Sequence, residues 1–460
     1  MRIETSPPLG KVDPDLRASE QPFDIPTVAD NARLLESIGS DGLVYEEIKD
    51  DPFVMLALAA RATRRLRLTT DGTIAFPRLP CRIREPAGRV SQPRRSVAQS
   101  GPGNETEGTM QGVVFHGERE LEIMNFPDPT PGPGEVVVEM KASGMCGSDL
   151  HQYRRPKAGR GQNATGLPPN PNPTIAGHEP CGVVAAIGPD VLPAEAKIGQ
   201  RVMVHHYQGC TQCDHCRSGW QQLCQQVPVK VYGSNSHGGH AKYLLVPANT
   251  LVPLADELTF SAGAAISCGS GTAYGALRRM NISGRDTIAI FGQGPVGLAG
   301  TQFAKAMGAR VIALDINPQR LARAREFGAD EVVDPGSNDP VAAIKDLTHG
   351  RYADLSLDTS SNSEARLNAI KSTKVWGTMC FVGEGGDVKI DVSPHLLRRQ
   401  MTLVASWTFS NIIQAECARF CIERKVDVDR LFTHRWKLEQ ADEAYKQFDK
   451  QSDGKGVFLM

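Results

Sequence analysis

Residues Asp286–Gly297 read D-T-I-A-I-F-G-Q-G-P-V-G, an apolar run that leads into a glycine-rich turn. Val296–Met307 continues with helical spacing, and the next apolar run, R-V-I-A-L-D, ends on Asp315. A strand, a G-x-G-x-x-G turn and a helix in this order open a dinucleotide-binding unit. The pattern therefore predicts a Rossmann-type, doubly wound parallel sheet in this part of the chain.

Each glycine of this turn has a separate physical role. Gly292 permits the tight turn, Gly294 lets a pyrophosphate approach the backbone, and Gly297 allows the helix to pack closely on the strand. The N-terminus of the helix, at Val296, then presents N–H groups and the positive end of its dipole to the phosphates.

Asp315 lies 18 residues beyond Gly297. A carboxylate at this distance accepts hydrogen bonds from both ribose hydroxyls and repels a 2′-phosphate. The sequence thus favours NAD over NADP, although Arg320, five residues further on, would soften that preference.

Further alternation of apolar runs and helical patterns follows the turn. It is sufficient for a six-stranded sheet, with segments at Glu331–Val333, Val341–Leu347, Leu355–Asp358, Met379–Val382 and Leu403–Ser406. Alternation of this kind is typical of an α/β fold.

A cluster of cysteines precedes the glycine-rich turn. The chain has 11 cysteines in 460 residues, so a window of 15 residues should hold about 0.4. Four cysteines nevertheless lie within 15 residues, with spacings x2, x2 and x7, at Cys210, Cys213, Cys216 and Cys224. Four thiolates complete a tetrahedral Zn²⁺ shell and leave no open position, which predicts a structural zinc site. A pair of disulfides or a redox C-x-x-C is the alternative.

Three further motifs lie on either side of this cluster. They are C-G-S-D-L-H at Cys146–His151, G-H-E at Gly177–Glu179 and S-C-G-S-G-T-A-Y at Ser267–Tyr274. A thiolate, an imidazole and a second thiolate from distant points would leave one zinc position open, as in a catalytic site.

In this order the motifs of residues 110–460 resemble the zinc-containing alcohol dehydrogenases of the medium-chain dehydrogenase/reductase family, in particular its polyol and threonine dehydrogenase-like bacterial branch. The resemblance implies a β-rich, GroES-like catalytic domain, to which Thr433–Met460 returns, beside the Rossmann domain. It implies that Cys146, His178 and Cys268 bind the catalytic zinc, with Glu179 behind the metal or as an alternative ligand. A cysteine at position 268, where polyol dehydrogenases often have a carboxylate, favours the alcohol dehydrogenase type and weakens any claim of polyol specificity.

The resemblance also implies roles for residues around that zinc. Asp149 would accept a hydrogen bond from His178, Ser148 and His151 would relay the alcohol's proton through a ribose hydroxyl, and Thr272 would orient the nicotinamide. Zinc acts as a Lewis acid on the substrate oxygen, and hydride passes to the nicotinamide. We expect pocket-lining residues on the long His151–His178 loop and on Ser406–Phe409.

The first 109 residues have a different character. Residues 1–83 show a parallel β-α-β pattern, with helical segments Val28–Ile38 and Pro52–Ala62 and strands Gly42–Tyr45 and Leu66–Thr70. This stretch resembles the opening units of flavin-dependent luciferase-like monooxygenases, an α/β barrel family, in truncated form. Residues 84–109 are rich in Pro, Gly, Ser and Arg and are predicted to be a disordered linker.

Composition excludes several classes of function. A net charge of −1 gives no electrostatic footprint for nucleic acid or an anionic membrane. The longest apolar run, Phe53–Ala60, is too short to span a bilayer, and the first 30 residues lack a signal-peptide core. We expect a cytoplasmic protein with reduced thiols.

Together with these observations, the resemblance implies a zinc- and NAD-dependent dehydrogenase for a secondary alcohol, polyol or hydroxy amino acid, with two zinc ions per chain. The expected divisions are a truncated α/β segment (1–83), a linker (84–109), a catalytic domain (110–260), a Rossmann domain (261–425) and a C-terminal return to the catalytic domain (426–460). By family analogy the chain forms a dimer or tetramer. A catalytically impaired NAD-binding fusion and a bifunctional flavin monooxygenase remain as alternatives.

Overall fold

The computed structural model describes residues 4–5, 42–46, 67–71, 108–156, 173–451 and 454–460. The chain divides into two compact units, Met1–Gly101 and Pro102–Met460. The finer divisions expected within each unit stay predictions. None of the helices among the described residues combines the length and apolar character that crossing a bilayer requires.

The first unit contains a three-stranded parallel sheet. Its strands, β1 (Glu4–Thr5), β2 (Gly42–Glu46) and β3 (Arg67–Asp71), pair in chain order, and Gly42 faces Arg67. The two strands and the parallel arrangement expected from the sequence are confirmed. The helical segments Val28–Ile38 and Pro52–Ala62 and the linker up to residue 107 lie outside the described residues, so the luciferase-like resemblance stays a prediction.

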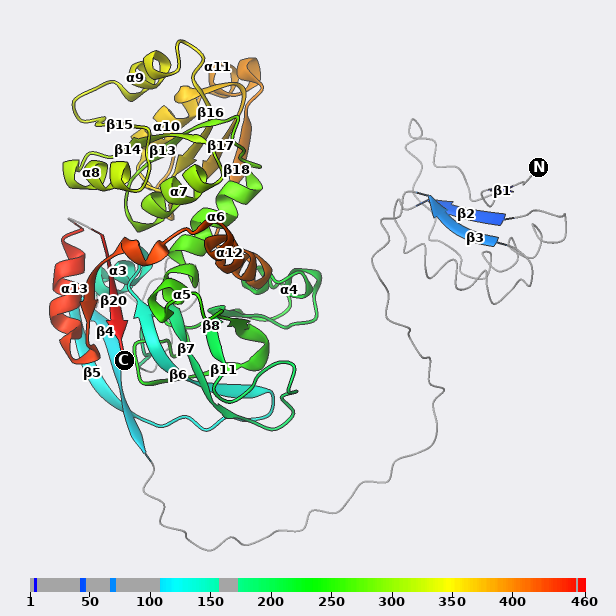
Figure 1. Cartoon of the computed structure of the whole chain (residues 1–460), viewed down its shortest axis with the longest axis vertical. Helices are drawn as coiled ribbons and strands as arrows, with labels where there is room; N and C mark the ends of the chain where they lie inside the picture. The colour runs from blue at the N-terminus through cyan, green and yellow to red at the C-terminus, as the bar shows by residue number, and fades with distance from the viewer. Residues whose placement is uncertain (1–3, 6–41, 47–66, 72–107, 157–172, 452–453) are drawn as a thin grey trace, which may run out of the picture. The chain divides into compact units, whose positions relative to one another are not determined.

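A six-stranded parallel sheet forms one part of the second unit (Figure 1). The strand order is β15-β14-β13-β16-β17-β18. The strands are β15 (Glu331–Val333), β14 (Arg310–Leu314), β13 (Thr287–Phe291), β16 (Ala353–Asp358), β17 (Thr373–Phe381) and β18 (Thr402–Ala405). The order reverses between β13 and β16, and ligands bind at the carboxyl ends of strands at such a switch point. The predicted doubly wound sheet is confirmed.

Helices flank this sheet and begin where local sequence favours them. They are α7 (Pro295–Ala306), α8 (Pro318–Glu326), α9 (Pro340–Leu347), α10 (Ser363–Ser372), α11 (Val392–His395) and α12 (Asn411–Arg424). Asn317, Asp339 and Asn362 cap the N-termini of α8, α9 and α10 by accepting backbone N–H groups. Proline in the first turn of α8 and α9 suits a position that needs no N–H donor.

The other part of the second unit is β-rich. Its main sheet runs β12-β8-β7-β6-β20-β19, and β11 also pairs with β6. The strands are β6 (Glu135–Gly144), β7 (Glu179–Ile187), β8 (Arg201–Val204), β11 (Tyr243–Pro247), β12 (Leu251–Pro253), β19 (Phe432–Trp436) and β20 (Lys455–Leu459). The C-terminal strand β20 pairs antiparallel with β6, so the end of the chain returns to this sheet.

Smaller elements complete this part of the unit. Strand β4 (Thr109–Gly117) pairs antiparallel with β5 (Glu120–Pro127). Strand β9 (Tyr207–Gln208) pairs antiparallel with β10 (Lys230–Val231). The helices are α3 (Gly147–Arg154), α4 (Asp214–Arg217), α5 (Phe260–Ile266), α6 (Gly269–Arg279) and α13 (Ala441–Asp449).

One apolar cluster joins the two sheets. It includes Met203 of β8, Ala264 of α5, Leu277 of α6 and Ile288 of β13, each almost fully buried. Helices α5, α6 and α12 lie between the two sheets (Figure 1). Because a shared core of this kind is close-packed, it holds the two sheets in a defined relation at the junction where the site lies.

The glycine-rich turn has the geometry that its sequence predicts. Gly292 has φ +91°, a conformation that side chains other than glycine rarely adopt. A Cβ on Gly297 would lie 1.9 Å from the carbonyl oxygen of Gly292, so only glycine lets α7 start this close to β13.

A buried ion pair closes the carboxyl end of β16. Arg366 Nε of α10 donates to Asp358 Oδ2 at 2.9 Å, and its Nη2 donates to the Gly383 carbonyl at 2.6 Å. Both side chains are almost fully buried. Arg366 therefore compensates the Asp358 charge and also fixes the loop that follows β17.

We expect Arg366→Met to lower the free energy of unfolding by about 3–5 kcal/mol, because it leaves the Asp358 carboxylate buried without its cationic partner. Denaturant unfolding followed by circular dichroism measures the change. Arg398→Met, at an exposed position, is the control and should stay within about 0.5 kcal/mol of the wild type. Equal stabilities of the two variants would contradict the role given to this ion pair.

Candidate metal and nucleotide site

A cavity of about 770 Å³ lies in the second unit. Cys146, His178 and Cys268 line one part of it, and Gly292 and Asp315 line another. The cavity also borders Ser148, His151, Thr272, Gly294, Val296 and Arg320. Segments that the sequence predicted to hold a metal and a dinucleotide therefore share one space.

Four buried side chains converge at the metal part of the cavity. They are Cys146, His178, Glu179 and Cys268, and their ligand atoms lie within 4.8 Å of one another. Cys146 precedes α3, Glu179 begins β7 and Cys268 precedes α6. The fold thus brings residues 122 positions apart to an Sγ–Sγ distance of 4.0 Å.

This geometry fits a zinc ion. Zn–S bonds of about 2.3 Å in a tetrahedron place two sulfur atoms about 3.8 Å apart, close to the separation of Cys146 and Cys268. Glu179 Oε2 is buried without a hydrogen-bond partner, as expected of an oxygen that faces a cation. Two thiols, an imidazole and a carboxylate also match the donor types that zinc prefers.

Asp149 holds two of these residues in place. Its Oδ1 accepts from His178 Nδ1 at 2.8 Å, and its Oδ2 accepts from the Cys146 backbone N–H at 2.9 Å. Burial lowers the pKa of His178, but the charges of Asp149 and Cys146 outweigh burial and raise it well above the usual value. The bond at Nδ1 leaves Nε2 of His178 for a metal.

Lys455 is a site residue that the sequence did not indicate. Its Nζ donates to Glu179 Oε1 at 2.7 Å and to the Met145 carbonyl at 2.7 Å, and it is almost fully buried. Burial raises the pKa of Glu179, and the Lys455 charge opposes that shift. Lys455 begins the C-terminal strand β20, 276 residues from Glu179, and no motif surrounds it.

The proposed relay and nicotinamide residues also border the cavity. Ser148 and His151 lie three residues apart on α3, and Ser148 Oγ is 4.0 Å from Cys146 Sγ. Thr272 lies on α6, four residues after Cys268. The structure thus brings all three near the ligand set.

Two aromatic residues of this wall were missed, His206 and Tyr207. His206 Nδ1 bonds the Ser267 carbonyl at 3.0 Å, and its ring centroid is 5.3 Å from that of His178. Burial lowers the pKa of His206, and the neighbouring His178 adds to this effect. The pair of histidines that precedes the cysteine cluster was the signal available in the sequence.

The nucleotide part of the cavity is organised by Asp315. Its Oδ2 accepts from the Gln293 N–H at 2.6 Å, its Oδ1 accepts from the Asn317 N–H at 2.8 Å, and Arg320 Nη1 lies 3.6 Å away. Arg320 also donates to the Gln451 carbonyl at 2.6 Å. Arg320 is therefore occupied by partners within the chain, which reduces its capacity to attract a 2′-phosphate.

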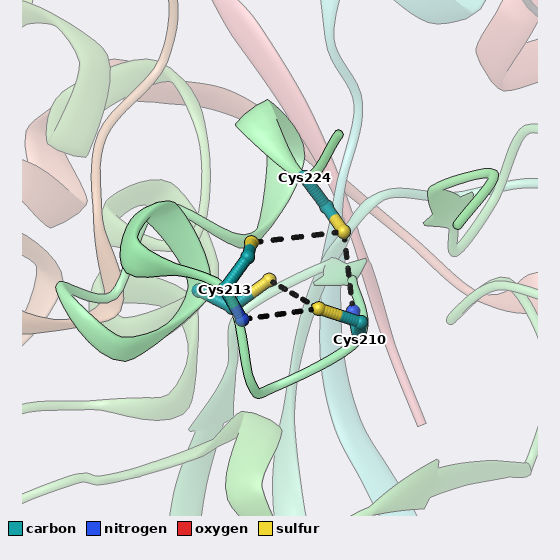
Figure 2. Close-up of side chains that lie close together, drawn as sticks. Cys210, Cys213 and Cys224 are labelled. Atoms are coloured by element: carbon teal, nitrogen blue, oxygen red, sulfur yellow. Dashed lines mark hydrogen bonds between the residues drawn. The ribbon is translucent and has the colours of Figure 1, made fainter. Parts of the chain in front are cut away.

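The four-cysteine lobe forms a second cluster of ligands (Figure 2). Cys210 Sγ lies 3.9 Å from Cys216 Sγ, and Cys213 Sγ lies 4.0 Å from Cys224 Sγ. These distances match the edge of a ZnS₄ tetrahedron, about 3.8 Å, and far exceed a disulfide bond of about 2 Å. All four cysteines are free thiols, so the disulfide alternative is wrong for this structure.

Backbone amides favour thiolates in this lobe. The N–H of Cys210 points to Cys224 Sγ at 3.4 Å, and the N–H of Cys213 points to Cys210 Sγ at 3.3 Å. Against the opposing effect of burial, backbone donors lower the pKa of Cys224 to about 6. The thiolate is the form that binds a metal.

Comparison with known families gives two matches. The family described as "Alcohol dehydrogenase GroES-like domain" matches residues 132–256, and the one described as "Zinc-binding dehydrogenase" matches residues 295–422. They cover the β-rich sheet except β19 and β20, and the parallel sheet except β13.

Curated relatives span the second unit. An uncharacterized zinc-type alcohol dehydrogenase-like protein of Escherichia coli, YphC, is 38% identical over 357 residues, covering 76% of this chain and 98% of the relative. Sorbitol dehydrogenase of Bacillus subtilis is 30% identical over 340 residues, covering 74% and 93%.

Solved structures agree in fold. Acetophenone reductase from Geotrichum candidum in complex with NAD is 28% identical with a TM-score of 0.65, and the match covers 78% of this chain and 99% of that one. The 2R,3R-butanediol dehydrogenase of Bacillus subtilis is 26% identical with a TM-score of 0.66, covering 76% and 99%.

The two ligand clusters predict two zinc ions per chain. Cys213→Ser should lower the zinc content to about one, because it removes a ligand from the lobe and leaves the other cluster intact. Inductively coupled plasma mass spectrometry on the purified protein measures the metal. Cys421→Ala, which changes a buried cysteine of α12 outside both clusters, should keep two. A wild-type content near one would mean that one cluster binds no zinc.

Proposed function

The chain belongs to the zinc-type alcohol dehydrogenase family, and we propose that its substrate is an alcohol with a second hydroxyl group beside the reacting carbinol, a vicinal diol or polyol. As a member of that family it is an oxidoreductase that transfers hydride between an alcohol and NAD. The narrower assignment rests on one residue of the cavity wall, Glu384.

Glu384 follows strand β17 in the loop fixed by Arg366, and it lines the same cavity as the metal ligands. Its side chain is half-buried, and no hydrogen bond or ion pair joins it to any other residue that the structure describes. Burial raises its pKa, and the nearby Cys146 adds to the shift while His178 opposes it. An unpartnered carboxyl group therefore faces the reaction centre.

A partly buried carboxylate without a partner binds donors more strongly than it binds an apolar group. A hydroxyl next to the reacting carbinol supplies such a donor. A simple secondary alcohol supplies none and would leave Glu384 desolvated. This difference favours diols and polyols among the alcohols that the family oxidises.

The charges along the cavity also argue against acidic substrates. The three Arg and Lys side chains among its described lining residues already have acidic partners: Arg154 pairs with Asp449, Arg320 with Asp315, and Lys455 with Glu179. Little positive charge is therefore left for a substrate carboxylate. This weakens the expectation of a hydroxy amino acid.

We assign the metal part of the cavity to catalysis. Cys146, His178 and Cys268 would hold the catalytic zinc, with Glu179 as an alternative ligand, and Cys210, Cys213, Cys216 and Cys224 the structural zinc. When bound, zinc supplies Lewis acidity at the open ligand position, and NAD supplies the hydride acceptor.

The remaining residues position groups and move a proton. Asp149 holds the His178 ring so that Nε2 faces the ligand set. Ser148 Oγ accepts the proton of the alcohol while its own hydroxyl proton passes through a ribose hydroxyl to His151, which lies one turn further on α3, is exposed and releases a proton to solvent. Thr272 lies beside the position for the nicotinamide, while Gly292, Gly294, Gly297 and Val296 form the turn for the pyrophosphate.

In this proposal Asp315 accepts hydrogen bonds from the ribose hydroxyls of the cofactor. Its carboxylate repels a 2′-phosphate, and Arg320, which already contacts Asp315 and Gln451, offers little compensation. We therefore propose NAD rather than NADP as the preferred form.

Glu384→Leu should lower kcat/KM for a vicinal diol by about 10- to 100-fold, as expected for a lost hydrogen bond to a charged group. The kcat/KM of the same variant for the matched monoalcohol should be equal to or higher than that of the wild type. Initial rates with NAD, read at the absorbance of reduced nicotinamide, compare 2,3-butanediol, sorbitol, 2-butanol and threonine. The exposed Glu443→Leu is the control and should leave all rates unchanged.

Two results would contradict the substrate assignment. One is a wild-type enzyme that oxidises 2-butanol as well as 2,3-butanediol, with the same ratio in Glu384→Leu. The other is a preference for threonine, which would require a cation for its carboxylate.

Cys146→Ser should lower kcat by more than about 100-fold, because even residues that only support zinc ligands typically contribute 10- to 100-fold. The affinity for NAD, measured by isothermal titration calorimetry, should remain, since Cys146 lies outside the glycine-rich turn. Turnover retained by this variant, with zinc content and NAD binding intact, would refute the assigned catalytic centre.

A further inference from the structure

One segment of the cavity wall has an unusual backbone conformation. Residues 406–410 connect β18 to α12, and Trp407 and Thr408 line the cavity. Thr408 has φ +53°, a left-handed conformation that is rare for a β-branched residue. Such a conformation costs about 1–3 kcal/mol and persists only where surrounding contacts hold it.

The contacts that hold Thr408 come from the four-cysteine lobe. Gln222 Nε2 donates to Thr408 Oγ1 at 2.7 Å and to the Phe409 carbonyl at 2.8 Å. Gln222 lies in the short 3-10 helix between Cys216 and Cys224, 186 residues from Thr408. The Asn411 N–H also donates to the Gly219 carbonyl at 3.2 Å, so the lobe contacts this part of the chain at Thr408–Phe409 and again at Asn411.

Aromatic packing ties the same segment to the reaction centre. Phe409 is fully buried, with its ring centroid 5.9 Å from that of His205 and 6.5 Å from that of His206. The rings of Trp407 and Tyr207 are 5.8 Å apart. A shift of Thr408 would therefore move the side chains that border the ligands Cys146 and His178.

We propose that Gln222 is a positioning residue through which the four-cysteine lobe holds the substrate-facing wall Trp407–Phe409 in its strained conformation. The lobe then has a part in substrate binding as well as in stability. The two hydrogen bonds of Gln222 offset the backbone strain at Thr408. Without them the wall relaxes and the substrate loses a preformed surface.

This inference does not depend on which alcohol is oxidised. It predicts a change in substrate binding and in the local order of the wall, and the second can be measured on protein without substrate. Substitution of a residue that only stabilised the fold would change neither substrate binding nor the local order of this wall selectively.

Gln222→Leu keeps the approximate volume of the side chain and removes both donors. We expect KM for the best alcohol to rise about tenfold, as for the loss of about 1.4 kcal/mol of hydrogen bonding. We expect kcat to change less than about twofold, since a contact equal in ground and transition states affects KM alone. The dissociation constant of NAD and the content of two zinc ions should stay at wild-type values.

Hydrogen–deuterium exchange gives the readout without turnover. Peptides that span 404–411 should exchange faster in Gln222→Leu, while peptides of β20 should not change. Gln226→Leu makes the same substitution at an exposed position of the same lobe and should match the wild type in KM and exchange.

A second pair of variants decides the matter if Gln222→Leu does not fold. Thr408→Val keeps the branched shape but removes the hydroxyl acceptor, so KM should rise about threefold to tenfold. Thr408→Ser keeps the acceptor and should stay near the wild type. Wild-type KM and exchange in both Gln222→Leu and Thr408→Val would overturn the proposal, as would equal loss in Gln226→Leu. An absence of alcohol oxidation by the wild type would instead refute the proposed function, and the exchange experiment would still test the wall.

Discussion

The burial of four ionisable groups within 4.8 Å is the constraint on which this structure depends. Two thiols, an imidazole and a carboxyl group withdrawn from water have a high free energy unless a cation shares their space. The surroundings meet part of this cost, because Asp149 pairs with His178 and Lys455 pairs with Glu179. A zinc ion held by Cys146, His178 and Cys268 would meet the rest.

The same constraint explains why the substrate site lies where the two sheets meet. Glu179 begins β7 and Cys268 precedes α6, both of which contribute to the shared core, and the glycine-rich turn opens onto the same cavity. Two residues that do not line the cavity hold its walls in place. Arg366 bonds to the loop that carries Glu384, and Gln222 bonds to the segment that carries Trp407. Substrate selectivity and structural stability therefore share contacts in this protein.

Motifs that bind a metal or a phosphate could be predicted because their chemistry restricts both residue type and local spacing. The cysteine lobe, the glycine-rich turn and the six-stranded sheet follow from short stretches such as Cys210–Cys224 and Asp286–Gly297. Ser406–Phe409 was correctly expected at the pocket, since Trp407 and Thr408 line it. The His151–His178 loop, expected to shape the entrance, lies largely outside the described residues.

The sequence alone was sufficient to predict the fold class and the cofactors zinc and NAD, and it indicated the two candidate ligand sets, because each depends on short motifs in a recognisable order. The three-dimensional structure was needed to show that Lys455 pairs with Glu179, that Glu384 has no partner among the described residues and that Gln222 reaches Thr408. Each of these residues is a single polar side chain outside any motif. Lys455 lies 276 positions from Glu179, and Gln222 lies 186 positions from Thr408. Contacts over such separations arise from the packing of sheets on a common core, which no local pattern in the sequence records.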